Sequence, residues 1–106
     1  LLVQRVRELL RTQPGTMLNA QALARALHVS TRTLHRQLLD EAASLQALKD
    51  EVRCAVAVEM LCRTKRPIKQ VAAAAGFASE KSFSRAFRHW TGRAPSDYRR
   101  DAAAAT

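Results

Sequence analysis

The hydrophobic and polar positions of residues 80–90 separate into two stripes at helical spacing. Aromatic residues recur at i, i+4 and i+7, and these are Phe83, Phe87 and Trp90. Cationic and polar residues recur at i, i+3, i+4 and i+7, and these are Lys81, Ser84, Arg85 and Arg88. Because successive residues of an α-helix are about 100° apart, the stripes point in roughly opposite directions. The pattern predicts a helix with an aromatic core face and an outer face suited to an anionic partner.

A short alanine-rich pattern precedes this helix and is separated from it by a glycine. The pattern predicts a helix over about residues 68–75, which Gly76 ends. Ser79 can cap the helix over residues 80–90, because its hydroxyl can accept a hydrogen bond from the first turn. A helix, a tight turn and a second helix with a basic outer face are typical of the helix-turn-helix motif, whose second helix enters a DNA major groove.

Amphipathic spacing and a capping residue predict two helices at the start of the chain. The first covers about residues 1–11 and ends at Gln13-Pro14-Gly15. Asn19 can cap the second, which runs to about residue 27. Leu18 and Leu23 would form a hydrophobic staple around that cap.

Two serines predict the starts of the next two helices. Ser30 can cap a helix over about residues 31–40, with Leu34 and Leu38 on its inner face. Ser44 can cap a long helix that runs to about residue 63. Its expected core positions are Leu48, Val52, Ala55, Val56 and Leu61. The charged residues between them are expected to be solvated, and these are Lys49, Asp50, Arg53, Glu59 and Arg63.

The C-terminal part of the chain is predicted to add one short helix. Gly92 ends the helix over residues 80–90, because glycine readily adopts a left-handed conformation. Pro95 lies near the first turn of a helix over about residues 96–100. Residues 102–106 form a low-complexity tail that is expected to fray. The predicted fold class is all-α, with about seven helices.

The two halves of the chain repeat one pattern of apolar and cationic positions. Leu23-Ala24 matches Val71-Ala72 at an offset of 48 residues. After the turn the offset is 49, where Leu34, Arg36 and Leu38 match Phe83, Arg85 and Phe87. One residue is therefore added in the second turn. The repeat predicts two helix-turn-helix subdomains, residues 1–43 and 64–101, joined by a linker helix over residues 44–63.

The length of the predicted linker helix suits the spacing of DNA grooves. A 20-residue helix is about 30 Å long. That is close to the roughly 34 Å between major-groove faces one turn apart. We expect the linker to hold two recognition helices over successive major grooves on one side of a duplex. The site should then be asymmetric and span about two turns, because the two units differ in sequence.

The charge of the chain indicates a polyanionic partner. The formal net charge is +9 and the sequence pI is about 11.1. Residues 1–63 carry nine Lys and Arg against six Asp and Glu, whereas residues 64–106 carry nine against three. Nucleic acid is the first expectation and an anionic membrane surface the second. The membrane interpretation is disfavoured, because the aromatic residues have core spacing rather than one exposed amphipathic face.

The remaining composition excludes several classes of site. Cys54 and Cys62 are eight residues apart on one predicted helix, about 12 Å along its axis, which is too far for a disulfide. We expect two buried or half-buried thiols in a reducing cytoplasm. No His and Cys spacing indicates a zinc site, and no metal or cofactor is expected. No apolar run approaches membrane-spanning length. The chain starts at Leu1 rather than Met, so we expect it to be part of a longer protein.

A larger set of residues resembles a known family. The set comprises Ile68, Val71-Ala72, Gly76-Phe77, Ser79, Phe83, Ser84-Arg85, Phe87, Gly92, Pro95 and Tyr98-Arg99. It is similar to the C-terminal signature of AraC/XylS-type bacterial transcription regulators, and the first unit, residues 23–38, also fits. The resemblance implies an all-α domain with two helix-turn-helix motifs that binds promoter DNA and usually activates transcription by contacting RNA polymerase. It also implies a separate N-terminal ligand-binding or dimerisation domain outside this chain.

The resemblance implies which residues face DNA. In the first recognition helix they are Thr31, Arg32, His35 and Arg36, and in the second they are Glu80, Lys81, Ser84 and Arg85. Two departures from the family pattern stand out. His28 occupies a turn position where glycine is frequent, so the first turn can differ in shape. Leu39 replaces an expected phosphate-binding cation, and it can either pack on the next helix or contact a thymine methyl group.

Several of these residues have alternative interpretations. Arg32 and Arg36 can bond guanine bidentately, or remain solvated. His35 can contact a base, a phosphate or nothing, and Arg85 can pair internally with Asp97 instead of DNA. Lys81, Ser84 and Arg88 are favoured as phosphate contacts. Glu80 can accept from a cytosine amino group or only favour the helix N-terminus.

The leading hypothesis is a sequence-specific, double-stranded DNA-binding transcription regulator. A nucleic-acid-binding module without sequence preference is less favoured, because single-strand binders expose aromatic side chains. A protein-interaction module can coexist with DNA binding. An enzyme is not indicated, since His28, His35 and His89 lie on separate elements without a catalytic partner.

Overall fold

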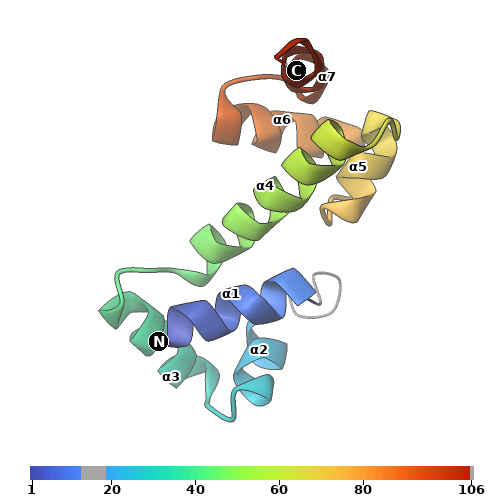
Figure 1. Cartoon of the computed structure of the whole chain (residues 1–106). Helices are drawn as coiled ribbons and strands as arrows, with labels where there is room; N and C mark the ends of the chain where they lie inside the picture. The colour runs from blue at the N-terminus through green and yellow to red at the C-terminus, as the bar shows by residue number, and fades with distance from the viewer. Residues whose placement is uncertain (13–18, 106) are drawn as a thin grey trace. The chain divides into compact units, whose positions relative to one another are not determined.

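The chain folds into helices throughout the part that the structure describes. The structure is a computed structural model that describes residues 1–12 and 19–105. Within these ranges there are seven α-helices and no strands (Figure 1). They are α1 (Leu2–Thr12), α2 (Ala20–Ala26), α3 (Thr31–Asp40), α4 (Leu45–Arg63), α5 (Ile68–Ala74), α6 (Glu80–Thr91) and α7 (Pro95–Ala104). The predicted all-α fold is confirmed.

The chain divides into two compact units. The first unit comprises Leu1–Val52 and the second comprises Arg53–Thr106, so the boundary falls within α4. The first unit holds α1, α2, α3 and the start of α4. The second unit holds the rest of α4 together with α5, α6 and α7.

The core of the first unit is aliphatic. Helix α3 contacts both α1 and α2. The buried residues are Val6, Leu10, Leu23, Ala24, Leu27, Leu34, Leu38, Leu45, Leu48 and Val52. The Glu41 carboxylate accepts hydrogen bonds from the backbone N–H groups of Leu2 and Val3, at 3.2 and 3.0 Å. This carboxylate thereby satisfies two of the four unpaired N–H groups at the start of α1.

The predicted capping residues begin their helices as expected. The Asn19 side chain accepts from the N–H groups of Gln21 and Ala22. Ser30, Ser44 and Ser79 each accept from the N–H three residues ahead, at 3.1 Å. The predicted end of the first helix at Gln13-Pro14-Gly15 and the staple residue Leu18 lie outside the described residues.

The core of the second unit is aromatic. Phe83 and Phe87 are fully buried and belong to a cluster with Ala57, Leu61, Val71, Ala72 and Ala75. Phe77, Trp90 and Tyr98 are partly buried against that cluster. The Phe87 and Tyr98 rings meet edge to face with centroids 5.3 Å apart, and Phe77 lies 5.5 Å from Phe83. The predicted core face of α6 is confirmed.

The structure corrects one predicted core position on α4. Ala55 is exposed, whereas Ala57 is fully buried. The buried positions of α4 are Leu45, Leu48 and Val52 in the first unit, and Ala57 and Leu61 in the second. The predicted stripe therefore includes Leu61 correctly but has Ala55 in the core in place of Ala57.

The structure also corrects the C-terminal prediction. Helix α7 begins at Pro95 and continues to Ala104, beyond the expected end near residue 100. Residues 102–104, which were expected to fray, are therefore helical. Their alanines have the highest intrinsic helix propensity, which extends the helix past its packed part.

Both cysteines are free, as expected from their spacing. Cys54 is half-buried, and burial raises the pKa of its thiol. Cys62 is exposed rather than buried or half-buried as the sequence indicated. No helix in the described part of the chain combines the length and hydropathy of a membrane span.

Candidate DNA interface

The two helix-turn-helix turns have the same backbone hydrogen-bond pattern. In the first, His28 N–H donates to Arg25 O at 3.2 Å and Val29 N–H donates to Ala24 O at 2.9 Å. In the second, Gly76 N–H donates to Ala73 O and Phe77 N–H to Ala72 O, both at 3.0 Å.

His28 and Gly76 also share a left-handed conformation, with φ of 59° and 89°. The prediction that the first turn can differ in shape from the second is therefore wrong at these positions. His28 adopts the conformation that glycine adopts in the second unit, although a side chain makes it less favourable. The extra residue of the second unit follows this turn and is Ala78, between Phe77 and Ser79.

Helix α3 presents the predicted first recognition surface. Leu34 and Leu38 are buried on its inner side, with exposed fractions of 0% and 1%. The predicted DNA-facing residues Thr31, Arg32, His35 and Arg36 are all exposed. Within the described residues, no side-chain hydrogen bond or ion pair engages any of these four. Their donors are therefore available to an external partner.

Helix α6 presents the second predicted surface in the same way. Phe83 and Phe87 are buried on its inner side. Glu80, Lys81, Arg85 and Arg88 are exposed, and Ser84 is half-buried at the edge of this face. Across residues 1–12 and 19–105, no side-chain contact neutralises the three cations. The exposed face of α6 thus carries three unpaired cations, together with the carboxylate of Glu80 in its first turn.

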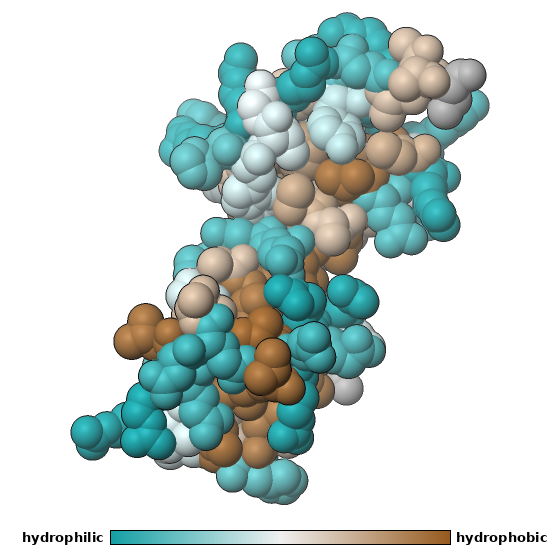
Figure 2. All heavy atoms as spheres, turned by 60° about the vertical axis from the view of Figure 1, so that its left-hand side comes forward, coloured by the Kyte–Doolittle hydropathy of each residue, from teal (hydrophilic) through white to brown (hydrophobic). Residues whose placement is uncertain are grey.

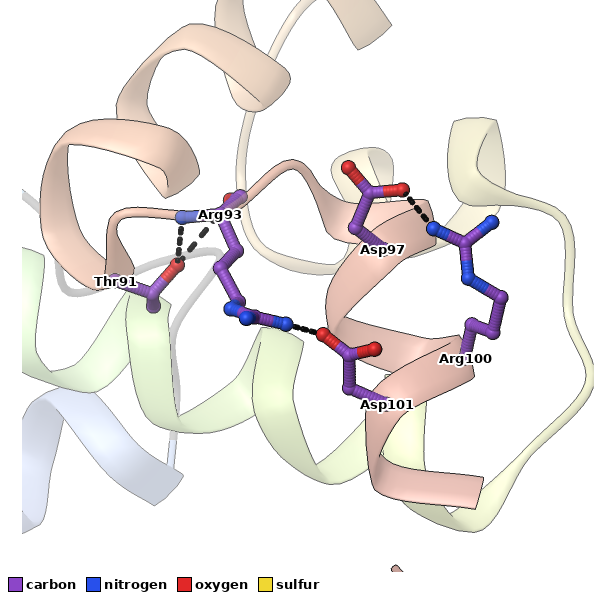
Figure 3. A network of polar contacts seen from close by, with 5 residues as sticks. All are labelled: Thr91, Arg93, Asp97, Arg100 and Asp101. Carbon is purple, nitrogen blue, oxygen red and sulfur yellow. Dashed lines mark hydrogen bonds and ion pairs between the residues drawn. The ribbon is translucent and has the colours of Figure 1, made fainter. Parts of the chain in front are cut away.

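A polar network at the end of α6 and along α7 engages both aspartates of this region (Figure 3). Asp97 accepts from Arg100 at 2.6 Å, and Asp101 pairs with Arg93. The alternative pairing of Arg85 with Asp97 is therefore wrong. Each aspartate is engaged by an arginine outside the recognition face, so the charge of Arg85 is retained on the α6 surface.

Arg53 supports the second turn, which sequence reasoning did not predict. It was expected to be solvated, but it is half-buried, and its guanidinium carbon lies 4.7 Å from the centroid of the Phe77 ring. The same guanidinium donates to Gly76 O at 3.4 Å. Arg53 thus holds the residue that begins the turn and the aromatic ring that follows it. The i+4 apolar spacing of α4 carries no signal for this contact.

Arg99 ties α7 to the connection between α4 and α5. Its Nε donates to Leu61 O at 3.1 Å and its Nη1 donates to Arg66 O at 2.7 Å. These carbonyls lie at the end of α4 and just before Pro67, where no helical N–H is available to them. Arg99 belongs to the family signature, and its sequence pattern predicts no role for it. Its neighbour Tyr98, which packs on the core, is a local signal that this part of α7 faces inward.

The described residues do not meet the requirements of a metal site. Among the described residues, no group of three or more His, Cys, Asp or Glu side chains is placed to hold a metal ion. Figure 2 shows hydrophilic side chains over much of the visible surface of each unit. The exposed arginines of α3, and the exposed Lys81, Arg85 and Arg88 of α6, are therefore the functional groups that the described structure offers most clearly.

Comparison with known proteins yields the same type of domain. A family model described as a helix-turn-helix domain matches residues 23–101. The ornithine utilization regulator of Pseudomonas aeruginosa is 42% identical over 98 residues, covering 92% of this chain and 29% of that protein. A DNA-binding transcriptional dual regulator from Escherichia coli K-12 superposes with a TM-score of 0.91 at 25% identity, covering 96% of this chain and 92% of that one.

A second solved structure extends the comparison to a longer protein. The transcriptional regulator CdpR from Pseudomonas aeruginosa superposes with a TM-score of 0.86 at 35% identity, covering 93% of this chain and 31% of that one. This chain spans 29% and 23% of the lengths of two curated relatives that it matches. The chain belongs to the AraC/XylS-type family of helix-turn-helix transcription regulators and is a DNA-binding domain of that family.

Proposed function

We propose that this domain recognises a specific double-stranded promoter sequence by inserting α3 and α6 into the major groove. The observation that carries the proposal is the same in both units. The second helix of each helix-turn-helix buries one face and presents exposed, unpaired cations on the other. Such a helix fits the DNA major groove, where the base edges offer hydrogen-bond donors and acceptors and the flanking phosphates are anionic.

The residues of α3 are assigned to base contact. Arg32 and Arg36 are exposed and lie four residues apart, on one side of the helix. An arginine bonded to guanine O6 and N7 contributes about 1–3 kcal/mol of discrimination against a wrong base. His35, between them in sequence and on the same face, adds a donor or an acceptor to a base edge. Thr31 lies at the helix start, where contacts to bases are most direct.

The residues of α6 are assigned a larger share of phosphate contacts. Lys81 and Arg88 lie seven residues apart on the exposed face, with Arg85 between them. Ser84 is half-buried at the edge of this face, and its hydroxyl is assigned to a phosphate contact as well. Neutralising phosphates releases counterions, which makes affinity fall steeply with salt. Arg85 is assigned to a base because the equivalent position of the repeat is Arg36.

We propose an asymmetric site with one helix in each of two successive major grooves. The tandem repeat in the sequence supports this, because both units run in the same chain direction and carry different residues on their outer faces. The proposed site spans about two turns of duplex, with half-sites about 10 base pairs apart. Insertion of five base pairs between the half-sites should abolish the contribution of one unit, because it moves that half-site to the opposite side of the duplex.

The activity of the whole protein is proposed on the same basis. We propose that a separate N-terminal effector or dimerisation domain accompanies this domain, since the matched relatives are much longer. We propose further that the whole protein acts in the cytoplasm at the nucleoid, and that it activates transcription through contact with RNA polymerase.

Selection from a random duplex pool, followed by binding measurements at several salt concentrations, tests the proposed function. The wild-type domain should select one asymmetric sequence. Arg36→Ala should relax preference at one or two base pairs. Lys81→Ala or Arg88→Ala should weaken all duplexes about equally and reduce the salt slope by about 1. Arg63→Ala is the matched control, because Arg63 is 80% exposed on α4, outside both recognition faces.

Two outcomes would contradict the proposal. Selection that yields no sequence preference, with salt-dependent binding of every duplex, would assign the domain to non-specific nucleic-acid binding. Identical affinities of Arg36→Ala and the wild type across a panel of site variants would remove the base-contact assignment of α3.

A further inference from the structure

Leu39 extends the exposed face of α3. It lies three residues after Arg36, four after His35 and seven after Arg32, which is the spacing of one helical face. Its side chain is 73% exposed. Packing of Leu39 on the next helix, one of the two alternatives that the sequence left open, is therefore wrong.

An isolated exposed leucine usually indicates nothing, because apolar side chains occur singly over most protein surfaces. Leu39 differs through its position. Only one other large hydrophobic residue of the described chain is comparably exposed, and that is Leu1 at the start of the chain. Figure 2 shows hydrophobic side chains exposed on the first unit among hydrophilic ones. Leu39 places such a side chain directly beside the cations that are assigned to DNA.

The internal repeat gives a second, independent argument. At the offset of 49 residues, Leu39 corresponds to Arg88 on α6, which is exposed and cationic. The residue after Leu39 is Asp40, an exposed acid. An alkyl group next to a carboxylate is unsuited to a phosphate, whereas Arg88 fits one. The two units therefore present different chemistry at the same point of their recognition helices.

We propose that Leu39 is a specificity-determining residue of the first unit, which contacts the C5 methyl group of a thymine in the major groove. This inference rests on the proposed function, because it requires α3 to lie in that groove. The thymine methyl is the apolar group on the major-groove edge of the four base pairs. Leu39 covers that methyl group while Arg32, His35 and Arg36 bond to polar base edges nearby.

The contact has a measurable size and a distinctive salt dependence. Burying one methyl-sized group is equivalent to about a fourfold change in affinity, on the scale of one buried CH₂ group. No charge is neutralised, so the contribution of Leu39 does not change with salt, in contrast to that of Arg88. Leu39 therefore contributes to the choice of sequence, whereas Arg88, at the equivalent position of the second unit, contributes affinity for any duplex.

A scan of the selected site with deoxyuridine tests the proposal. Each thymine of the half-site bound by α3 is replaced in turn by deoxyuridine, which lacks only the methyl group. The wild type should lose about fourfold in affinity at one thymine. Leu39→Ala should bind the thymine site about fourfold more weakly than the wild type and should be insensitive to that replacement.

Leu39→Arg supplies the opposite change. It installs the residue type of Arg88, so it should raise affinity for all duplexes, steepen the salt slope by about 1 and remove the sensitivity to deoxyuridine. Circular dichroism should show unchanged helicity for both variants, because Leu39 is 73% exposed.

Two results would overturn the inference. One is a wild type that is insensitive to deoxyuridine at every thymine of that half-site, and the other is a Leu39→Ala variant that keeps the sensitivity. If the wild type still selects a sequence and Arg36→Ala still relaxes it, the inference on Leu39 alone has failed. If no sequence is selected at all, the proposed function has failed, and the inference fails with it.

Discussion

His28 and Gly76 adopt the same left-handed backbone conformation in the equivalent turns of the two units, with φ of 59° and 89°. In each turn, the N–H of this residue and the N–H of the next residue donate to carbonyls three and five residues earlier. Glycine adopts this conformation readily, whereas the side chain of histidine makes it less favourable.

The two turns should therefore respond oppositely to an exchange of residue type. His28→Gly should stabilise the first unit by up to about 1 kcal/mol, because a side chain in the left-handed region costs roughly 1–2 kcal/mol and glycine loses part of that gain in chain entropy. Gly76→His should destabilise the second unit by about 1 kcal/mol. Urea unfolding monitored by circular dichroism measures both. His89→Gly, at an exposed position within α6, serves as the control and should lower stability.

The tie between α7 and the end of α4 predicts a large effect at Arg99 and a small one at its neighbour. Arg99→Met removes two hydrogen bonds from a charged donor to otherwise unpaired carbonyls and should cost about 1–3 kcal/mol in the free energy of unfolding. Arg100→Met removes only the pair with Asp97, which is exposed, and should cost less than about 1 kcal/mol. Equal losses for the two variants in urea unfolding would show that the Arg99 contacts contribute no more than an exposed ion pair.

The two thiols should differ in reactivity. Burial raises the pKa of the Cys54 thiol, so a smaller fraction is thiolate at neutral pH, and access to it is also restricted. Iodoacetamide should therefore alkylate the exposed Cys62 first, and alkylation of Cys54 should increase only at higher pH. Mass spectrometry of peptides from the native protein, sampled over time at several pH values, measures the two rates. In urea the rates should converge, because unfolding removes the burial.

Replacement of Glu80 distinguishes its two alternative roles. Glu80→Gln removes a negative charge from the exposed start of α6, so binding to all duplexes should strengthen. Stability should fall by about 0.3–1 kcal/mol, because an acid interacts favourably with a helix N-terminus. If Glu80 instead accepts from a cytosine amino group, the selected sequence should lose its preference at one position. Selection with the variant, together with its unfolding midpoint, separates the two roles.

Much of the local structure was predictable because its causes lie close together in the sequence. The capping serines Ser30, Ser44 and Ser79 each act on a group three residues ahead. The core stripe of α6 follows from helical periodicity, and Gly92 ends that helix in the left-handed conformation as expected. The exposed cations on α3 and α6 follow from the same periodicity, since burying one helical face leaves the other free.

The sequence by itself determined the helices, their caps, the aromatic and aliphatic character of the two cores, and the cationic outer faces, because each depends on residues within about one or two helical turns. Only the tertiary structure decided that Arg53 lies over Phe77, that Arg99 binds carbonyls before Pro67, and that Leu39 is left uncovered. The partners in these contacts are distant in sequence, and a guanidinium or an alkyl group has the same local pattern whether a neighbouring helix covers it or not.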